Sequence, residues 1–345
     1  MKHRKYTPIQ IIGTQRSGSN LLRLMLNELD DVSAPHPPHI LKTFVPLLSR
    51  YEDISADVNF QQLISDVCQL IQTNPVVWEK IELDEERIYQ QCENRTLVEV
   101  FRVVYELMAE ANGATHWCCK SMGNVKFTDE LESSGMQPMY IRLVRDGRDV
   151  AASFKKVAVG EKHVYHLAHY WKNLQSLSKK LVDSVGHSRA ITISYEELIR
   201  EPEQTMKGIC DFLQLPYTSK VLNYFDSVES LHTAESGFMW QNVKKPILSN
   251  NSEKYRKILS KEEIEIFEAV AADVLEENGY TLSTGIKKRQ FSTEEIDVFD
   301  KENIQMKQET LKQAHLRIDL SKRHKQEIFI NSIKNRKLIH TPVLL

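Results

Sequence analysis

The chain has 345 residues, of which 41% are hydrophobic and 27% charged, and its formal net charge is −2. This size and composition predict one large globular domain, or one domain with an extension. The near-neutral charge gives no general support for a partner that is a nucleic acid or an anionic membrane. No apolar stretch approaches the ~20 residues that a membrane-spanning helix needs, and the basic N-terminus lacks the apolar segment of a signal peptide.

Cysteine usage indicates a reducing environment. The cysteines are odd in number and contain no Cys-X-X-Cys pair. Neither a disulfide framework nor a structural zinc site is therefore predicted. The expected location is cytoplasmic. The five residues are Cys68, Cys92, Cys118, Cys119 and Cys210.

The first predicted strand covers residues 9–12, and it leads directly into a loop with two glycines. Residues 13–20 read Gly-Thr-Gln-Arg-Ser-Gly-Ser-Asn, and a leucine-rich helical pattern follows as far as Leu29. A strand, a glycine loop and a helix in this order can bind a phosphate on backbone N–H groups at the helix N-terminus. An ordinary tight turn is the alternative, since glycines also serve steric needs.

The loop departs from the P-loop of kinases and ATPases at its end. Gly13 and Gly18 have the P-loop spacing, but Ser19 and Asn20 stand where those enzymes need Lys followed by Ser or Thr. The cation of this loop is Arg16, which lies between the two glycines. The pattern therefore points away from ATP and towards a different phosphate-containing donor.

A proline-rich segment and a long helical region follow this first unit. Residues 33–39 read Ser-Ala-Pro-His-Pro-Pro-His, and their prolines exclude a helix or an inner strand. From about residue 41 to residue 112, apolar residues recur with a helical period, as at Leu63, Val67 and Leu70. We predict a helical insertion over 41–112.

Three further strands are predicted, and they cover residues 115–120, 139–144 and 190–195. Helical patterns follow at 196–213 and 261–278. Strands that alternate with helices predict an α/β fold, with a three-layer parallel sheet flanked by helices. Ligands of such sheets bind at the carboxyl ends of the strands, which is where the first loop, Arg145 and Tyr195 fall.

A charged helical extension is predicted for residues 286–345, after a main domain at 1–285. The extension has more basic than acidic residues, long polar helical runs and few aromatic side chains. A solvated charged face is favoured here over a partner-binding or dimerising arm. The C-terminal helices stay open as the contact of a homodimer.

A second anion site is indicated by Arg145, which follows the strand at 139–144, and by Ser153 on the next helix. A guanidinium and a hydroxyl at the start of a helix can bind an anion. The alternative is that Arg145 only forms surface ion pairs with Asp146 and Asp149. Two anion sites at neighbouring strand ends suggest one ligand with phosphate groups at both ends.

These two motifs resemble those of PAPS-dependent sulfotransferases, where PAPS is 3′-phosphoadenosine 5′-phosphosulfate. Residues 13–23 are similar to the family's 5′-phosphosulfate loop, and residues 140–154 are similar to its 3′-phosphate motif. Residues 193–198 resemble its Tyr-Glu-Asp/Glu-Leu segment, and Lys244-Lys-Pro246 resembles part of its C-terminal pattern. The resemblance covers about 9–280 and implies the P-loop sulfotransferase fold.

The resemblance also implies roles for individual residues. The 5′-phosphosulfate group is expected to contact Arg16, Ser17, Gly18, Ser19 and Asn20. The 3′-phosphate is expected to contact Arg145 and Ser153, while Tyr195 approaches the adenine and Lys245 reaches a phosphate. A tyrosine that only packs and a lysine that only faces solvent are the alternatives for the last two.

The chemistry of sulfuryl transfer suits these residues. The reaction needs charge stabilised on the leaving phosphate oxygen and on the transferred group, and Arg16 offers a fixed cation with a bidentate fork. No metal ion is expected, because a sulfuryl group carries less negative charge than a terminal phosphoryl group and needs a metal clamp less. The residue after Leu143-Val144 agrees with this, since it is Arg145 and not an aspartate. Lys120 resembles the family lysine that approaches the sulfuryl group, with a solvated lysine at a strand end as the alternative.

A general base must take the proton of the acceptor. Tyrosylprotein-type relatives place a glutamate in the loop after the first helix, but this loop has no carboxylate between Val32 and Phe44. Cytosolic family members use a histidine after the middle strand, whereas residues 120–123 contain none. His36 is therefore the candidate base and His39 the second candidate, since a histidine titrates near neutral pH. Packing or surface roles stay open for both.

Three histidines, His163, His166 and His169, recur at every third position and can share a helix face. A pocket-lining or packing role is favoured over a metal site for them, and they are candidates for contacting the acceptor. The nature of the acceptor is not readable from the chain.

The sequence as a whole predicts a sulfotransferase that moves a sulfuryl group from PAPS to a hydroxyl or amine and releases PAP (3′,5′-adenosine bisphosphate). The expected acceptor is a small molecule, a carbohydrate or a lipid. A non-catalytic nucleotide sensor or scaffold with the same fold is the alternative. A P-loop kinase is less favoured, because it needs a lysine after Gly18 and a strand-end aspartate for magnesium.

Overall fold

A computed structural model describes residues 5–285 and 289–336 of the chain. The first four residues of the basic N-terminus and parts of the predicted extension, at 286–288 and 337–345, lie outside these described residues. Five parallel strands form one sheet in the order β2-β3-β1-β4-β5, which confirms the predicted α/β fold. The strands are β1 (Thr7–Gly13), β2 (Val32–Ser33), β3 (His116–Cys119), β4 (Met139–Val144) and β5 (Ala190–Ser194).

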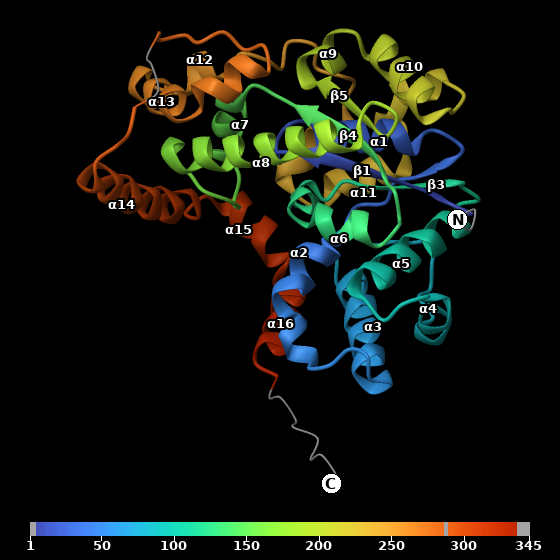
Figure 1. Cartoon of the computed structure of the whole chain (residues 1–345). Coiled ribbons are helices and arrows are strands. Elements are labelled where there is room, and N and C mark those ends of the chain that lie inside the picture. Colours follow the sequence, from blue (N-terminus) through green and yellow to red (C-terminus); the bar gives the residue numbers. More distant parts are fainter. Residues whose placement is uncertain (1–4, 286–288, 337–345) are drawn as a thin grey trace.

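Helices cover both faces of this sheet and make three layers (Figure 1). On one face, Trp117 of β3 packs in a core with α5 (Leu97–Ala111), and Tyr140 of β4 packs with α8 (Val164–Val185). On the other face, α1 (Ser19–Asn27) and α10 (Pro202–Leu213) share a core with Cys118, Ile141 and Ile193. Inner parallel strands are buried on both faces, which explains why β1 is apolar at Ile9, Ile11 and Ile12 and buried even at Gln10.

The order of the strands places the site. Strands β3 and β4 lie on either side of β1, so the carboxyl end of β1 sits where the order of the sheet reverses. Open α/β sheets bind their ligands at such a point. The register pairs Ile12 with Arg142 and Gly13 with Leu143, which brings the first glycine loop next to the end of β4.

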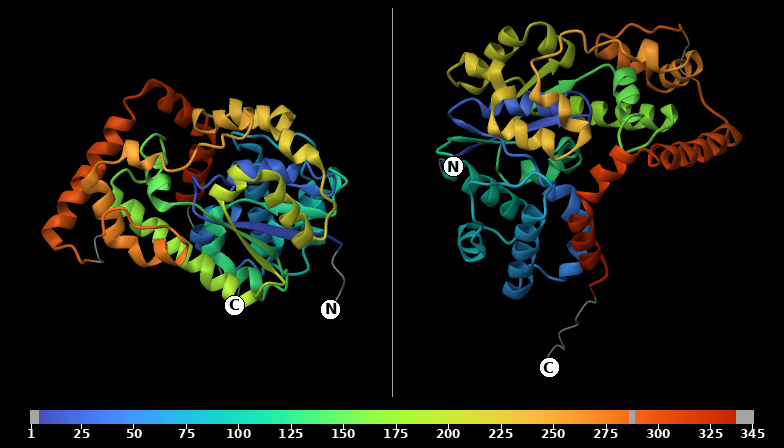
Figure 2. Two further views of the ribbon diagram at one scale, coloured as in Figure 1. Left: turned by 90° about the horizontal axis from the view of Figure 1, so that it is seen from above. Right: turned by 180° about the vertical axis from the view of Figure 1, so that it is seen from behind.

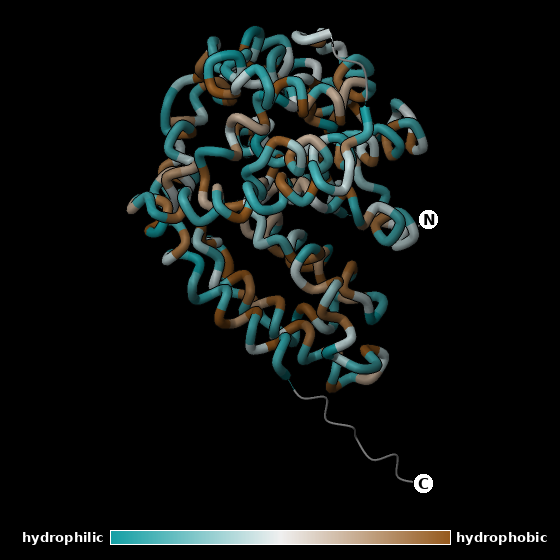
Figure 3. The backbone as a smooth tube through the Cα atoms, turned by 90° about the vertical axis from the view of Figure 1, so that its left-hand side faces the viewer, coloured by the Kyte–Doolittle hydropathy of each residue, from teal (hydrophilic) through white to brown (hydrophobic). Residues whose placement is uncertain are grey.

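The predicted insertion forms a helical lobe whose core continues onto one face of the sheet at Trp117 and Cys119. Its helices are α2 (Ile40–Phe44), α3 (Asp57–Gln72), α4 (Glu85–Gln91) and α5, with a 3₁₀ segment, η1, at Val45–Tyr51. Their apolar faces make one core that includes Phe60, Leu63 and Phe101. Figure 3 shows this lobe below the α/β body, with hydrophobic stretches along its helices.

The second half of the chain adds short helices around the sheet. The predicted helix over 196–213 is two helices, α9 (Tyr195–Arg200) and α10, because Pro202 starts a new helix after the non-helical Glu201. The others are α6 (Thr128–Ser133), α7 (Gly147–Phe154), α11 (Val228–Glu235), α12 (Tyr255–Ile258) and α13 (Lys261–Glu277), with 3₁₀ segments η2 (Met122–Phe127), η3 (Ser219–Asp226) and η4 (Phe238–Lys244).

The C-terminal extension packs against the body along its length. It consists of α14 (Thr293–Thr310), α15 (Ala314–Ser321) and α16 (His324–Lys334). Phe299 of α14 stacks on His163, Asp319 of α15 accepts hydrogen bonds from η4, and Phe329 and Ile333 of α16 are buried in the core of the helical lobe. Figure 2 shows this path from above and from behind. The extension is helical, but the favoured solvated face is wrong for these buried positions.

Among the described residues, no helix combines the length and the apolar character that a membrane crossing requires. The boundary at residue 285 and a homodimer contact through the C-terminal helices stay predictions.

Candidate active site

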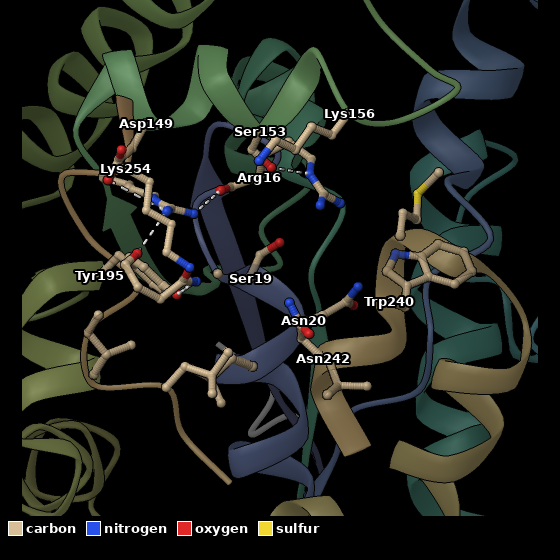
Figure 4. A pocket seen from close by; sticks show the side chains of 18 of the residues that line it. Arg16, Ser19, Asn20, Asp149, Ser153, Lys156, Tyr195, Trp240, Asn242 and Lys254 are labelled. Carbon is tan, nitrogen blue, oxygen red and sulfur yellow. Dashed lines mark hydrogen bonds and ion pairs between the residues drawn. The ribbon is translucent and has the colours of Figure 1, made fainter. Parts of the chain in front are cut away.

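A cleft of about 340 Å³ opens at the carboxyl ends of β1, β4 and β5 (Figure 4). Its floor is the glycine loop after β1. Two positions of that loop require glycine, because Gly13 and Gly18 have φ values of +127° and +89°. A side chain at Gly18 would also place its Cβ 2.3 Å from the Tyr195 ring. Arg16 itself adopts a φ of +70°, so the loop holds its cation in a backbone conformation that few residues accept.

The N-terminus of α1 is open towards the cleft. Its cap residue is Gly18, and no side chain caps it. Ser19 and Asn20 line the cleft, whereas Ser17 is fully buried and does not line it, and its Oγ has no hydrogen-bond partner among the described residues. Free backbone N–H groups and a helix dipole make this a site for an anion.

The two motifs that the sequence indicated meet in this cleft. Arg16 Nε donates a hydrogen bond to Ser153 Oγ over 3.1 Å, and Arg145 Nη1 donates one to the Arg16 carbonyl over 2.9 Å. Burial, helped by the nearby charge of Arg145, lowers the pKa of Arg16 to about 10. Two guanidinium groups held this close favour a bound anion, which would offset their repulsion.

Side chains around the end of β4 hold Arg145 in place. Trp171 Nε1 donates to the Arg145 carbonyl over 3.1 Å, and the Arg145 guanidinium lies 4.3 Å from the centre of the Tyr195 ring. Asp149 approaches it at 3.7 Å, which is the ion pair that the alternative interpretation expected. Because Arg145 also contacts Arg16 and lines the cleft, this ion pair orients the guanidinium and leaves it available to a ligand.

Tyr195 lines the same cleft and has aliphatic as well as polar neighbours. It is 5% exposed, and its hydroxyl accepts a hydrogen bond of 2.6 Å from Asn251 Nδ2. Ile199, Ile247 and Leu248 line the wall beside it. An aromatic ring among aliphatic side chains suits a flat heterocycle such as a nucleobase.

Several cleft residues carry no signal in the sequence motifs. Lys156 lies on the turn that follows α7, three positions after Ser153. This helical spacing is the one feature of the sequence that could have indicated that Lys156 faces the cleft. Asn251 and Lys254 come from the irregular segment before α12, and Trp240 comes from η4. These side chains reach the cleft only through the tertiary fold.

Lys245 lies elsewhere. Its side chain is exposed and does not line the cleft, while its carbonyl accepts a hydrogen bond of 2.8 Å from Tyr224. The structure therefore does not bring Lys245 together with the other residues predicted to bind phosphate. Lys254 does line the cleft, and it lies beside Tyr195 in Figure 4.

Lys120 lies at the carboxyl end of β3 and is 8% exposed. Burial, with added repulsion from Arg23 and Arg16, lowers the pKa of its ammonium group to about 7. The environment of Lys120 thus disfavours its charge in the absence of an anion. It is not the solvated strand-end lysine that the alternative interpretation supposed.

The two candidate bases lie near Lys120, with His36 buried and His39 half-buried. His36 is 3% exposed, its ring meets Trp240 edge-on at 4.8 Å, and neither ring nitrogen has a partner among the described residues. The ring of His39 forms a hydrogen bond of 3.0 Å from Nδ1 to Ser121 Oγ. Burial, followed by repulsion from Lys120, lowers the pKa of both imidazoles well below the ordinary value.

Two of the three histidines at the start of α8, His163 and His166, contact the C-terminal extension. His163 Nε2 lies 3.2 Å from Glu302, and His166 Nε2 lies 3.0 Å from Asp300. His163 is the N-cap of α8, and His169 packs against Tyr165. These contacts are the packing role that the sequence favoured, with α14 as the partner. Among residues 5–285 and 289–336, no group of three or more His, Cys, Asp or Glu side chains is placed to hold a metal ion.

A model of the sulfotransferase family matches residues 8–219, which include the glycine loop, Lys120, Arg145, Ser153 and Tyr195. The chain belongs to this family. Solved sulfotransferase domains have the same fold. The domain of the Synechococcus PCC 7002 olefin synthase has a TM-score of 0.53 and 21% identity, and the match covers 78% of this chain and 96% of that domain. The domain of the curacin biosynthetic pathway has a TM-score of 0.54 and 20% identity, over 81% of this chain and all of that domain.

Curated relatives are named for tyrosine sulfation. Protein-tyrosine sulfotransferase A of Caenorhabditis elegans is 23% identical over 63% of this chain and 52% of its own length. Protein-tyrosine sulfotransferase 2 of Gallus gallus is 23% identical over 65% of this chain and 55% of its own length. The chain thus spans about half the length of these relatives. Together with the family match, they support sulfuryl transfer as the reaction class.

Proposed function

We propose that this protein transfers a sulfuryl group from PAPS to a hydroxyl or amine of an acceptor. The observation that carries the proposal is the contact between the two anion motifs. Arg16 donates a hydrogen bond to Ser153, and Arg145 donates one to the Arg16 carbonyl. A ligand that satisfies both motifs needs negative groups at two ends of one molecule. PAPS has a phosphosulfate at one end and a 3′-phosphate at the other, and an adenine that suits the Tyr195 wall.

The residues of the cleft fit such a donor. The uncapped start of α1, with Ser19 and Asn20 on the cleft wall, would hold the 5′-phosphosulfate, and Arg145 and Ser153 would hold the 3′-phosphate. The cleft lining adds Lys156 and Lys254 as further cations. When bound, PAPS would supply an activated sulfuryl group at the end of the cleft near Arg16.

Arg16 and Lys120 would stabilise charge in the transition state. Both lie at the carboxyl ends of adjacent strands, and burial lowers the pKa of each. Cations that are poorly solvated before the reaction interact strongly with charge that develops on a leaving phosphate oxygen. Such preorganised groups need no reorganisation at the moment of transfer.

His36 would take the proton of the acceptor. Its lowered pKa keeps the imidazole neutral at physiological pH, so a ring nitrogen is free to accept a proton. Both of its nitrogens lack partners, whereas His39 already bonds Ser121. This difference favours His36 over His39. The candidate acceptors are a small molecule, a carbohydrate or a lipid, and a tyrosine hydroxyl is added to them. The reason is that the curated relatives are named protein-tyrosine sulfotransferases.

Thermal unfolding tests the donor assignment. Saturating PAP should raise the melting temperature by about 5 °C, and ATP with magnesium should raise it less. The variant Arg145→Gln should lose most of the shift by PAP, while Arg200→Gln, which changes an exposed arginine on α9, should keep it. Equal or greater stabilisation by ATP with magnesium would contradict the proposal.

A further inference from the structure

A second cavity, of about 260 Å³, adjoins the glycine loop, and its described lining residues all differ from those of the donor cleft. Gln15 lines this cavity, whereas the next residue, Arg16, lines the cleft. In the same way, Phe154 lines the cavity and its neighbour Ser153 lines the cleft. Because Arg16 Nε donates a hydrogen bond of 3.1 Å to Ser153 Oγ, this bonded pair stands between the two spaces. The cavity therefore lies next to the cation proposed to stabilise the transferred group.

The wall of this cavity is mainly apolar. Its apolar side chains are Phe127, Phe154, Val159, Leu167, Tyr170 and Leu174. Phe154 is buried, and its ring meets the Tyr170 ring edge-on with their centres 5.8 Å apart. Aromatic and aliphatic walls suit an apolar ring. A dry cavity of roughly 150 Å³ is enough for benzene, so the larger space here can hold a substituted ring.

The polar side chains of the cavity are half-buried or exposed. They belong to Gln15, Lys42, Lys126 and Glu161. The Glu161 carboxylate is already engaged, since it forms an ion pair with Lys307. Because these side chains keep contact with solvent, they mark the mouth of the cavity and not its interior. A carbohydrate in the interior would give up hydrogen bonds to water without regaining them from the wall.

The charge of Arg16 reaches the wall of this cavity. Lys162 is 2% exposed, and its Nζ donates hydrogen bonds to the carbonyls of Val159 and Gly160 over 2.8 and 3.1 Å. Both of these acceptor residues line the cavity. Burial lowers the pKa of Lys162 to about 8, and the charge of Arg16 adds to this effect. The Arg16 guanidinium is thus close enough to act on the cavity wall as well as on the donor cleft.

We propose that this cavity binds the acceptor and that the acceptor carries its hydroxyl on an apolar ring. The inference rests on the proposed sulfotransferase function. PAPS would occupy the donor cleft, which leaves this cavity as the neighbouring space for the second substrate. The ring would pack against the aromatic wall and direct its hydroxyl towards Gln15 and Arg16. A free phenol and a tyrosine side chain share this chemistry, whereas a carbohydrate does not.

Binding to the PAP-loaded protein tests the inference. The probes are 4-propylphenol, a short peptide with a single tyrosine, and methyl glucoside, each titrated by calorimetry into the millimolar range. At least one of the two phenol-bearing probes should bind about tenfold more tightly than the glucoside, because only an apolar ring gains from burial in this cavity. Tighter binding of the free phenol or of the peptide identifies which source of the ring the site prefers.

The preferred probe should also be sulfated when labelled PAPS replaces PAP. The bond between sulfur and the leaving phosphate oxygen breaks, a bond between sulfur and the phenol oxygen forms, and the phenol proton leaves. The label should therefore move from PAPS to the probe in amounts equal to the PAP released.

A variant that fills the cavity tests its role directly. Gly123 lines the cavity, and a Cβ at this position would meet no heavy atom within 4 Å. Gly123→Leu should therefore weaken the preferred probe at least about tenfold and leave the Kd for PAP unchanged. Gly208→Leu on α10, where a Cβ also meets open space, is the matched control and should behave as the wild type.

A variant that enlarges the cavity gives a second measurement. Phe127 is a half-buried wall residue, and Phe127→Ala lengthens the space open to a ligand. The affinity for 4-hexylphenol relative to 4-propylphenol should rise about threefold or more, because the longer chain buries more apolar area. A change of preference in this direction cannot come from loss of folding.

The outcomes distinguish two failures. If PAP fails to bind the wild type, the proposed function fails. If PAP binds but the glucoside binds as tightly as both phenol-bearing probes, or if Gly123→Leu and Phe127→Ala both leave probe binding unchanged, the apolar acceptor site is wrong while the sulfotransferase assignment stands. A probe that binds in the cavity and is never sulfated would likewise overturn the role of the cavity as the acceptor site.

Discussion

At the scale of single residues, the site gathers buried cations close to one another. Burial lowers the pKa of both Arg16 and Lys120, and the neighbours that act on them are mainly other cations. Such groups cost folding free energy and are kept where a ligand needs them. These cations should therefore lower the free energy of unfolding while they support function. A substitution of Lys120 measures this effect most directly.

Lys120→Met should raise stability at neutral pH and abolish sulfuryl transfer. The pKa of Lys120 is about 7 in the folded protein and near 10.5 in its ordinary state, so the unfolded chain holds the extra proton between these values. Stability of the wild type therefore rises from pH 7 to pH 10 and is lower below pH 7. Removing the ammonium group should add on the order of 1–3 kcal/mol at pH 7, and less at pH 10.

Urea unfolding at pH 7 and pH 10 checks this prediction, with Lys126→Met as the matched control on the exposed side of η2. The control should change stability little at either pH. A Lys120→Met protein that is less stable than the wild type at pH 7 would show that the ammonium group is stabilising, contrary to its burial among cations.

His36→Ala should lower turnover while it leaves PAP binding nearly unchanged. A general base contributes about 10²–10⁴-fold to a rate, and His36 lies beyond the residues that line the donor cleft. Discontinuous assays with PAPS and an acceptor substrate of the wild type give kcat, and calorimetry with PAP gives the Kd. His39→Ala should reduce kcat less, because its ring already bonds Ser121. Full activity of the His36→Ala variant would show that His36 is not the general base.

At the scale of elements, the start of α1 is the feature on which donor binding depends. Gly18 ends the loop with a φ of +89°, and the Tyr195 ring fills the space that a side chain would occupy. Gly18→Ala would strain the backbone and push Tyr195 aside. PAP affinity should fall at least about tenfold, and stability should fall by roughly 1–3 kcal/mol.

Gly208→Ala provides the matched control for Gly18→Ala. Gly208 lies within α10, has an ordinary helical conformation and has open space at its Cβ position. Alanine there should add about 0.5–1 kcal/mol of stability and leave the Kd for PAP unchanged. Calorimetry and urea unfolding of both variants give the comparison. Normal PAP affinity in Gly18→Ala would show that donor binding does not depend on the start of α1.

Elements with strong local patterns could be predicted from the sequence. The apolar runs of β1, β4 and β5 and the glycine loop are local signals, and they placed Arg16, Arg145 and Tyr195 at strand ends as the structure has them. Strand β2 has two residues, too few for any pattern. Trp240 and Arg323 come from irregular or distant segments, so their positions depend on tertiary packing that the sequence does not display.

At the scale of the molecule, the C-terminal extension ties the two lobes together. Helix α14 packs on the start of α8, α15 on η4, and α16 on the core of the helical lobe. The ion pair of Arg336 with Asp66 adds a contact beyond the end of α16. His36 contacts both lobes, since its carbonyl accepts a hydrogen bond from Trp78 Nε1 and its ring meets Trp240. The position of this candidate base should therefore depend on how firmly α16 is anchored.

Phe329→Ala should test this dependence. The Phe329 ring is buried in the core of the helical lobe, and its loss should cost about 3 kcal/mol of unfolding free energy. Ile328→Ala is the control, since Ile328 is 56% exposed and its change should stay within about 0.5 kcal/mol. Urea unfolding measures both.

The functional effect of Phe329→Ala should be selective. Arg323 caps the N-terminus of α16, so loosening the helix shifts the guanidinium that faces Trp240, whose ring meets His36. The donor cleft lies in the α/β body and has no lining residue from α16. The kcat should therefore fall while the Kd for PAP stays that of the wild type. A parallel loss of PAP binding would mean that the extension supports the whole α/β body, and an unchanged kcat would mean that His36 keeps its place without the Phe329 anchor.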